Sequence, residues 1–186
     1  MTLRLGLILT LWTLSSGATF ADTPAFALFQ RLCVDTHANP AAALAAAKAE
    51  GFVEPLPAII KDLATLQLEG SQSRAKLVDD GILILVVGHK PFPAGPGMTM
   101  AGCALVIAPA DGPSEEALAT WAGAGQTQGD DGQPFFLFTG DPAHRRSALD
   151  ASGDELAAAA KNGDLQIAGA SHKPDVTVLI YGPVQP

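Results

Sequence analysis

The chain between Thr23 and Gly51 has apolar residues at the spacing of helices. Three of them lie on one face of the first segment: Phe26, Phe29 and Cys33. Thr23-Pro24 is suited to begin this helix, because threonine caps helices and proline fits the first turn. Asn39-Pro40 repeats this signal before the run AAALAAAKAE, whose intrinsic helix propensity is high. Two helices are therefore predicted here, and a third, short one over residues 59–68.

From about Leu77 onward the apolar residues group into blocks of strand length. Residues 82–87 form a continuous run of isoleucine, leucine and valine, which is typical of a strand covered on both faces. Residues 102–108 form a second block, and an antiparallel hairpin with a long loop is the simplest connection between the two. The other predicted strands are 135–138, 165–170 and 176–181, of which the last two pair across residues 172–175.

Polar residues between these blocks predict two more helices and a loop. Asp111 is expected to cap a helix with Pro113 in its first turn, and Ser152 with Glu155 fits a capping box that opens another. The polar, glycine-rich residues 123–133 are predicted to form a loop. The whole pattern predicts a single α+β domain over residues 22–186. In it, N-terminal helices pack on a mainly antiparallel sheet of about five strands.

The first 21 residues have the features of a secretory signal peptide. Arg4 supplies a positive start, residues 5–14 are apolar, and Thr19-Phe20-Ala21 ends in a small residue suited to cleavage. The alternative is a membrane anchor, but about ten apolar residues are too few for a bilayer core that needs about twenty. We therefore expect residues 1–21 to be removed, and the protein to be periplasmic or secreted without stable membrane insertion.

The net charge of the chain limits the kinds of partner it can bind, but it does not point to an activity. The 186 residues carry a formal net charge of −8, and 48% of them are hydrophobic, enough to build a core. Nucleic acid binding requires clustered lysine and arginine, which an acidic chain of this kind does not supply. We expect no nucleic acid partner.

The chain contains two cysteines, Cys33 and Cys103. In an oxidising compartment an even number favours a disulfide, and the alternative is two separate buried thiols. A bridge would close a loop of about 70 residues and stabilise the fold by roughly 4 kcal/mol in the chain-entropy model. It would also attach the first helix to the central sheet.

Sequence motifs for catalysis or metal binding are absent. None of the four histidines lies four residues from another, and neither H-E-x-x-H nor G-x-S-x-G occurs. Asp35 and His37 are two potential metal ligands in one short segment, but a turn between two helices explains them more simply. We therefore predict no catalytic residue, no metal site and no cofactor.

One segment is a candidate ligand site. Residues 141–146 (DPAHRR) follow a predicted strand and hold adjacent arginines in an acidic chain. Two guanidinium groups can clamp a carboxylate or a phosphate through paired hydrogen bonds. The alternative is a solvated turn whose arginines pair with acidic residues of the same protein. His144, Arg145 and Arg146 are accordingly the predicted ligand-binding residues, for a small anionic ligand.

A spaced pattern of residues begins in the first helix: Phe29-x3-Cys33-Val34-x-Thr36-x3-Pro40-x2-Ala43, continuing through Ala47 to Gly51-Phe52. It resembles the start of a group of small secreted proteobacterial proteins of unassigned function. The resemblance includes a second cysteine after a central β segment, matched here by Cys103. It implies a signal peptide, a helical start and one disulfide, and it carries no catalytic residues.

Three functions remain open at this point. The first is a non-catalytic exported module that binds or supports another component of the cell envelope, which export and the lack of a reactive motif favour. The second is a periplasmic enzyme whose histidine and carboxylate residues meet only in the fold. The third is a carrier that holds a small ligand between the sheet and the helices.

Overall fold

The computed structural model describes residues 23–55, 68–92, 97–123, 126–128, 134–141 and 144–186. Within these ranges the protein is α+β, with four α-helices, one π-helical turn and an eight-stranded antiparallel sheet. The predicted signal peptide, residues 1–21, and residues 59–67 of the short predicted helix lie outside the described residues.

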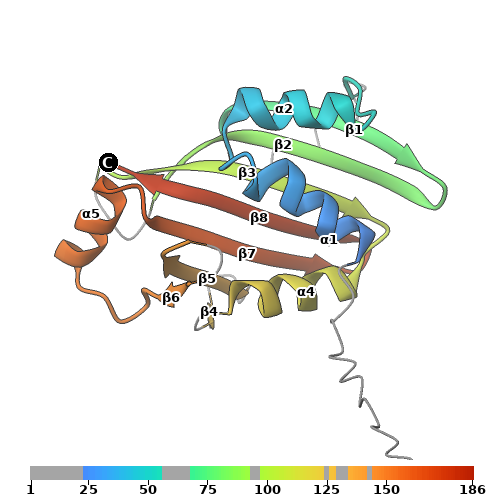
Figure 1. Ribbon diagram of the computed structural model, residues 1–186. Helices are drawn as coiled ribbons and strands as arrows, with labels where there is room; N and C mark the ends of the chain where they lie inside the picture. Colours follow the sequence, from blue (N-terminus) through green and yellow to red (C-terminus); the bar gives the residue numbers. More distant parts are fainter. Residues whose placement is uncertain (1–22, 56–67, 93–96, 124–125, 129–133, 142–143) are drawn as a thin grey trace, which may run out of the picture.

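The sheet has the strand order β1-β2-β3-β8-β7-β5-β4, and β6 pairs with β5 (Figure 1). The strands are β1 Glu69–Val78, β2 Gly81–Pro91, β3 Thr99–Ala108, β4 Gln126–Gln128, β5 Pro134–Thr139, β6 Arg146–Ser147, β7 Leu165–Lys173 and β8 Val176–Gln185. The predicted antiparallel hairpins β2–β3 and β7–β8 are both present, with Leu85 opposite Leu105 in the first.

The number of strands is higher than the predicted five. β1 has the polar sequence EGSQSRAKLV at the edge of the sheet, where exposed residues provide no apolar alternation to recognise. The loop predicted over residues 123–133 is wrong at residues 126–128, which form strand β4. β6 is only two residues long.

The helices begin at the capping residues that the sequence predicts. They are α1 Pro24–Phe29, η1 Gln30–Val34, α2 Pro40–Ala49, α4 Gly112–Ala122 and α5 Gly153–Lys161. Thr23 accepts a hydrogen bond from the backbone N–H of Phe26, and Asn39 accepts one from that of Ala42. The capping box of Ser152 and Glu155 is formed at the start of α5.

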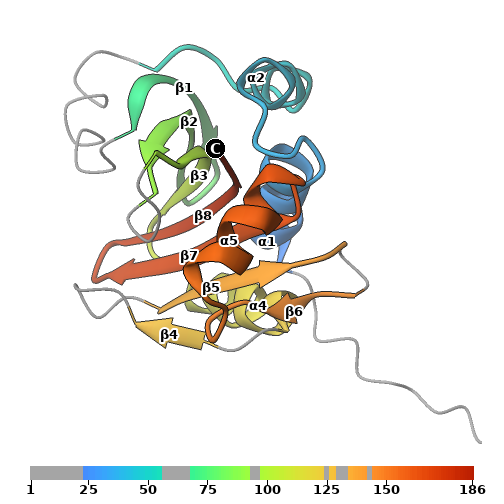
Figure 2. The same ribbon diagram turned by 90° about the vertical axis from the view of Figure 1, so that its left-hand side faces the viewer.

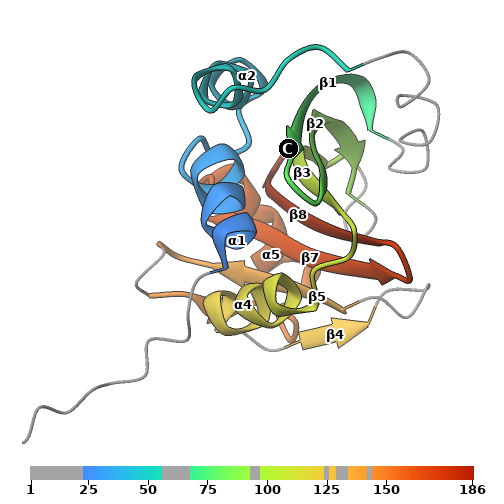
Figure 3. The ribbon, with the colours of Figure 1, turned by 90° about the vertical axis from the view of Figure 1, so that its right-hand side faces the viewer.

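Helices α1, α2 and α4 lie on one face of the sheet (Figures 1 and 3), and the sheet curves around them (Figure 2). Alternate residues of β2 divide between the two faces, as the period of a strand requires. Leu83, Leu85 and Val87 belong to the helix-side core, whereas Ile84 and Val86 are buried on the opposite face. The prediction that this strand is covered on both faces is confirmed.

The fourth helix, α5, packs on that opposite face, near the C-terminal end of β8 (Figure 1). Its buried residues Leu156 and Ala160 share a cluster with Leu137, Leu165 and Val184 of the sheet.

The part of the chain that the structure describes contains no helix long and apolar enough to cross a membrane.

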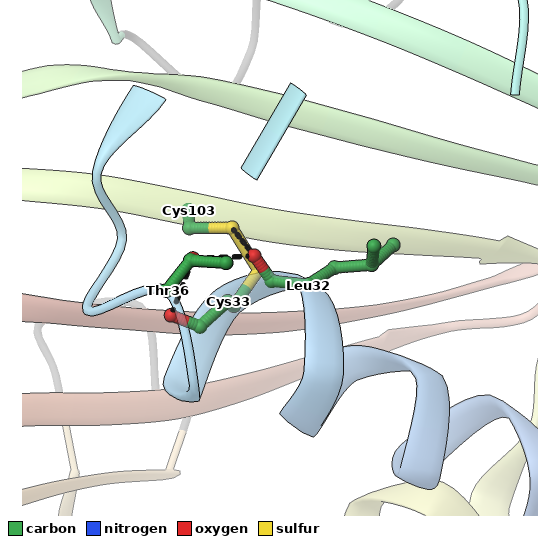
Figure 4. The surroundings of a disulfide bond; sticks show 4 residues. All are labelled: Leu32, Cys33, Thr36 and Cys103. Carbon is green, nitrogen blue, oxygen red and sulfur yellow. Dashed lines mark hydrogen bonds between the residues drawn. A yellow bond between two sulfur atoms is a disulfide. The ribbon is translucent and has the colours of Figure 1, made fainter. Parts of the chain in front are cut away.

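The predicted disulfide between Cys33 and Cys103 is present and joins η1 to β3 (Figure 4). Both cysteines are 0% exposed. In the π-helical turn, the backbone N–H of Asp35 donates five residues back, to the carbonyl of Gln30. The Thr36 hydroxyl donates to the Leu32 carbonyl oxygen at 2.7 Å. The Thr36 side chain therefore provides a hydrogen-bond donor for the carbonyl of Leu32, next to the disulfide-bonded Cys33.

Candidate functional site

The start of α4 is tied to α1 by side-chain hydrogen bonds. Asp111 occupies the predicted cap position, but its carboxylate accepts from the Ser114 hydroxyl at 2.6 Å instead of from a backbone N–H. Ser114 is 0% exposed and also forms a hydrogen bond with the hydroxyl of Thr23, the cap of α1. The two helices therefore begin in one shared polar cluster.

Thr177 extends this cluster to the β7–β8 hairpin. Its hydroxyl oxygen accepts from the backbone N–H of Asp111 at 2.9 Å and lies 3.2 Å from Nδ1 of His172. When Nδ1 of a neutral imidazole accepts a hydrogen bond from the threonine hydroxyl, the ring N–H lies on Nε2. Thr177 is 0% exposed, so its hydroxyl anchors α4 to the sheet from inside the protein.

A groove of about 380 Å³ lies beside α4. Its lining comes from α4, β4, β5 and β7: Gly112, Glu115, Glu116, Ala119, Gln126, Pro134, Phe136, Ala170 and His172. Phe136 and Ala170 are buried members of the helix-side core, whereas Glu115, Glu116, Gln126 and His172 carry the polar groups. The groove therefore combines an apolar wall with carboxylate, amide and imidazole groups.

The electrostatics of the groove are set by its two carboxylates. Glu115 lies in the first turn of α4, where the helix dipole stabilises negative charge. Its Oε2 is 3.9 Å from Nδ1 of His172, and the two side chains are 31% and 47% exposed. This separation is longer than a hydrogen bond, so the pair interacts by charge only when the imidazole is protonated. The groove is suited to a ligand that donates hydrogen bonds or carries positive charge.

Metal binding has no geometric basis among the residues that are described. No three histidine, cysteine, aspartate or glutamate residues within those ranges come close enough to hold an ion. All four histidines are exposed: His172 lines the groove, and His37, His89 and His144 lie on other elements. His37 lies in the turn between η1 and α2, as the simpler interpretation of Asp35 and His37 predicts.

The other end of α4 carries an aromatic cluster centred on Trp121. The Trp121 ring meets Phe26, Phe138 and Tyr181 edge-on, with centroids 6.3, 5.9 and 6.1 Å apart. The Tyr181 hydroxyl donates to Oε1 of Gln166 at 2.9 Å. Burial raises the pKa of Tyr181 to about 12, although the nearby Arg145 opposes the shift. This phenol therefore stays protonated throughout the physiological range.

The predicted ligand-binding residues His144, Arg145 and Arg146 have different surroundings. The guanidinium carbon of Arg145 lies 3.8 Å from the centre of the Trp121 ring, and its Nη1 donates to the Trp121 carbonyl oxygen at 2.6 Å. Arg146 is exposed on β6, and the exposed His144 lies 3.2 Å from the carboxylate of Asp141. Arg145 is therefore engaged within the protein, and binding of a small anion by this segment stays a prediction.

Comparison with protein-family models, curated proteins and solved structures finds no match to this chain. The candidate site therefore depends on geometry alone. The sequence predicts Asp111 as a cap, but it does not reveal its partner Thr177 or the position of His172 beside Glu115. No sequence signal could have shown these contacts, since Asp111 and Thr177 are 66 residues apart.

Proposed function

We propose that the protein is an exported, non-catalytic binding module that holds a basic group of a cell-envelope partner in the groove beside α4. The observation that carries the proposal is the placement of Glu115, Glu116 and His172 around the apolar wall of Phe136. Carboxylates beside an apolar wall suit the ammonium or guanidinium end of a side chain whose stem is apolar.

Export is part of the proposal and has two supports. The sequence of residues 1–21 fits a secretory leader, and α1 begins with its own cap at Thr23, so cleavage after Ala21 would leave this cap intact. The buried disulfide is typical of an oxidising compartment such as the periplasm or the cell exterior. The resemblance to small secreted proteobacterial proteins supports the same location.

A non-catalytic role is favoured over an enzyme by the geometry of His172. A general base is best oriented by a close hydrogen-bonded carboxylate, and here Glu115 is 3.9 Å away while Thr177 engages Nδ1. A small-ligand carrier is the second candidate, because a groove of about 380 Å³ can hold a compact molecule.

The test is a titration of isotope-labelled protein with two capped tripeptides, Ala-Lys-Ala and Ala-Glu-Ala, followed by amide chemical shifts. The basic peptide should shift amides at Gly112, Ala119 and Ala170, and the acidic peptide should not. The double variant Glu115→Gln, Glu116→Gln should lose the response, and Asp154→Asn on α5 should keep it. Shifts at another surface, or equal shifts from both peptides, would refute the proposed site.

A second arm separates a protein partner from a small ligand. Envelope extract is passed over immobilised wild-type protein and over the double glutamine variant, and the bound material is analysed for proteins and for small amines. A protein retained by the wild type alone supports the binding module. A small amine retained in its place supports the carrier.

A further inference from the structure

The two edge strands of the sheet differ in what lies beside them. At β1 the segment after α2 runs alongside, and the backbone groups of Val53 and Ala75 exchange two hydrogen bonds of 2.8 Å. At the other end of the strand order is β4, next to β5 (Figure 2). No strand of the described ranges pairs with β4 on its other side. Within those ranges, β4 is thus the edge to which a further strand can pair.

The register of β4 shows which of its backbone groups face this edge. Opposite residues of an antiparallel pair alternate between those that exchange hydrogen bonds and those that do not. Gln128 lies opposite Pro134, which has no N–H to exchange. The backbone groups of Gln128, and of Gln126 two residues before it, therefore point away from β5, whereas those of Thr127 point toward it.

A contact of β5 agrees with this assignment. The carbonyl oxygen of Leu137 accepts from the backbone N–H of Ala148, the residue after β6. Because β7 occupies the other side of β5, Leu137 directs its backbone groups to the side that β4 and β6 share. The backbone alternates with a period of two residues, so Phe135 also directs its groups to that side, toward Thr127.

The edge of β4 borders the groove beside α4. Gln126 lies opposite Phe136, so both side chains are on the helix-covered face, where they line the groove. On a strand added to β4, the residue opposite Gln126 would point its side chain to this same face. Glu115 and Glu116 line the groove as well, and their carboxylates attract a basic side chain.

We propose that the partner binds as an extended segment that adds an antiparallel strand to β4, with a lysine or arginine opposite Gln126 that places its side chain in the groove. Backbone hydrogen bonds to Gln126 and Gln128 hold the segment, and Glu115 with Glu116 selects its basic residue. This mode of binding rests on the proposed function, since it takes the groove as the cation site and adds how the partner's backbone is held.

The test uses a capped pentapeptide, Ala-Val-Lys-Val-Ala, and two forms of it in which one backbone nitrogen is methylated. When the lysine lies opposite Gln126, its N–H points to β4, whereas the N–H of each valine points away. Methylation of the lysine nitrogen should weaken binding about tenfold, because one hydrogen bond is lost and the methyl group meets the edge. Methylation of the second valine's nitrogen should change the affinity by less than about twofold. Amide shifts of Gly112 and Ala119 in isotope-labelled protein measure the affinities.

The amides of β4 give a second measurement at the same edge. The unmodified peptide should slow hydrogen exchange at the Gln126 amide and should not change exchange at the Thr127 amide, which already faces β5. Gln126→Pro removes the outward N–H, and proline is tolerated at such a position of an edge strand. This variant should bind the peptide about tenfold more weakly than Gln126→Ala, which loses only the side chain.

The results distinguish a failure of strand addition from a failure of the proposed function. Weaker binding of the lysine-methylated peptide, together with protection of the Gln126 amide, supports strand addition. Equal binding of both methylated peptides, with shifts at the groove and no protection of Gln126, would overturn strand addition but not the cation site. No response to the pentapeptide or to Ala-Lys-Ala would overturn both.

Discussion

The two ends of the helix-covered face are held down by different means. Under α1 and α2 the contact is apolar and covalent: Cys33 and Cys103 are fully buried, and alanines of α2 pack closely on the sheet. Under α4 the apolar contact of Leu118 and Ala122 is supplemented by hydrogen bonds and a cation, through Thr177, Asp111 and Arg145. Both ends belong to one continuous core.

The difference separates stability from recognition. A sealed apolar contact leaves no polar group for a ligand, whereas the α4 end exposes carboxylates and an imidazole beside an aromatic wall. Buried polar contacts are also directional, so they set the position of α4 more narrowly than apolar packing does. We infer that the disulfide end supports the fold and that the α4 end carries the function.

The largest expected effect is at the disulfide end. The double variant Cys33→Ala, Cys103→Ala should lose about 4 kcal/mol of unfolding free energy, because the bridge no longer restricts the unfolded chain. Urea denaturation measures the loss. Wild-type protein that is unfolded and refolded in the presence of a reductant should have the same unfolding free energy as the double variant. The reductant should not change the stability of the variant. A variant as stable as the wild type would show that the covalent link is not what holds this end.

Tyr181 tests the polar end through pH. It is the single tyrosine of the chain, so absorbance of the phenolate reports it directly, with an expected midpoint near 12. Because the pKa of Tyr181 is about 12 in the folded protein, against about 10 when unfolded, its contribution is intact below pH 10 and is lost between about pH 10 and 12. The full loss is roughly 2–3 kcal/mol.

The matched variant for this titration is Tyr181→Phe. It should be less stable at neutral pH, since Gln166 loses its hydrogen-bond donor, but it should lack the tyrosine part of the alkaline loss. A phenolate midpoint near 10 in the folded protein would mean that this end is open to solvent.

The smallest effect is expected at Thr177. Thr177→Val removes the acceptor of the Asp111 N–H and should cost about 2 kcal/mol, measured by urea denaturation. Thr177→Ser keeps the hydroxyl and should lose clearly less. If the valine and serine variants have the same unfolding free energy, the hydroxyl does not hold α4. The difference between the disulfide end and the α4 end is then smaller than we infer.

Local chemistry was sufficient to predict much of the fold. The caps at Thr23 and Asn39, the capping box at Ser152 and the apolar strand at residues 82–87 are all present, because each depends on residues within a few positions. Pairing of two lone cysteines could be predicted from their number. The polar edge strand β1 was missed, since it has no apolar face that a periodicity could reveal.

The site was predicted much less well than the fold. The adjacency of the arginines predicts an anion clamp, which stays a prediction, and it could not reveal that Arg145 stacks on Trp121, 24 positions away. The groove brings residues of α4 together with His172 of β7. Contacts of this kind depend on strand order, which adjacent residues do not encode.

The amino-acid sequence by itself determined the α+β class, the helix starts and the cysteines available for a bridge, because these follow from short-range propensity and composition. The tertiary structure alone decided which polar groups meet: Thr177 with Asp111, Glu115 with His172, and Arg145 with Trp121. These contacts form because the strand order β3-β8-β7-β5 brings distant segments of the chain together under α4. The groove lies at one end of this helix and the aromatic cluster of Trp121 at the other.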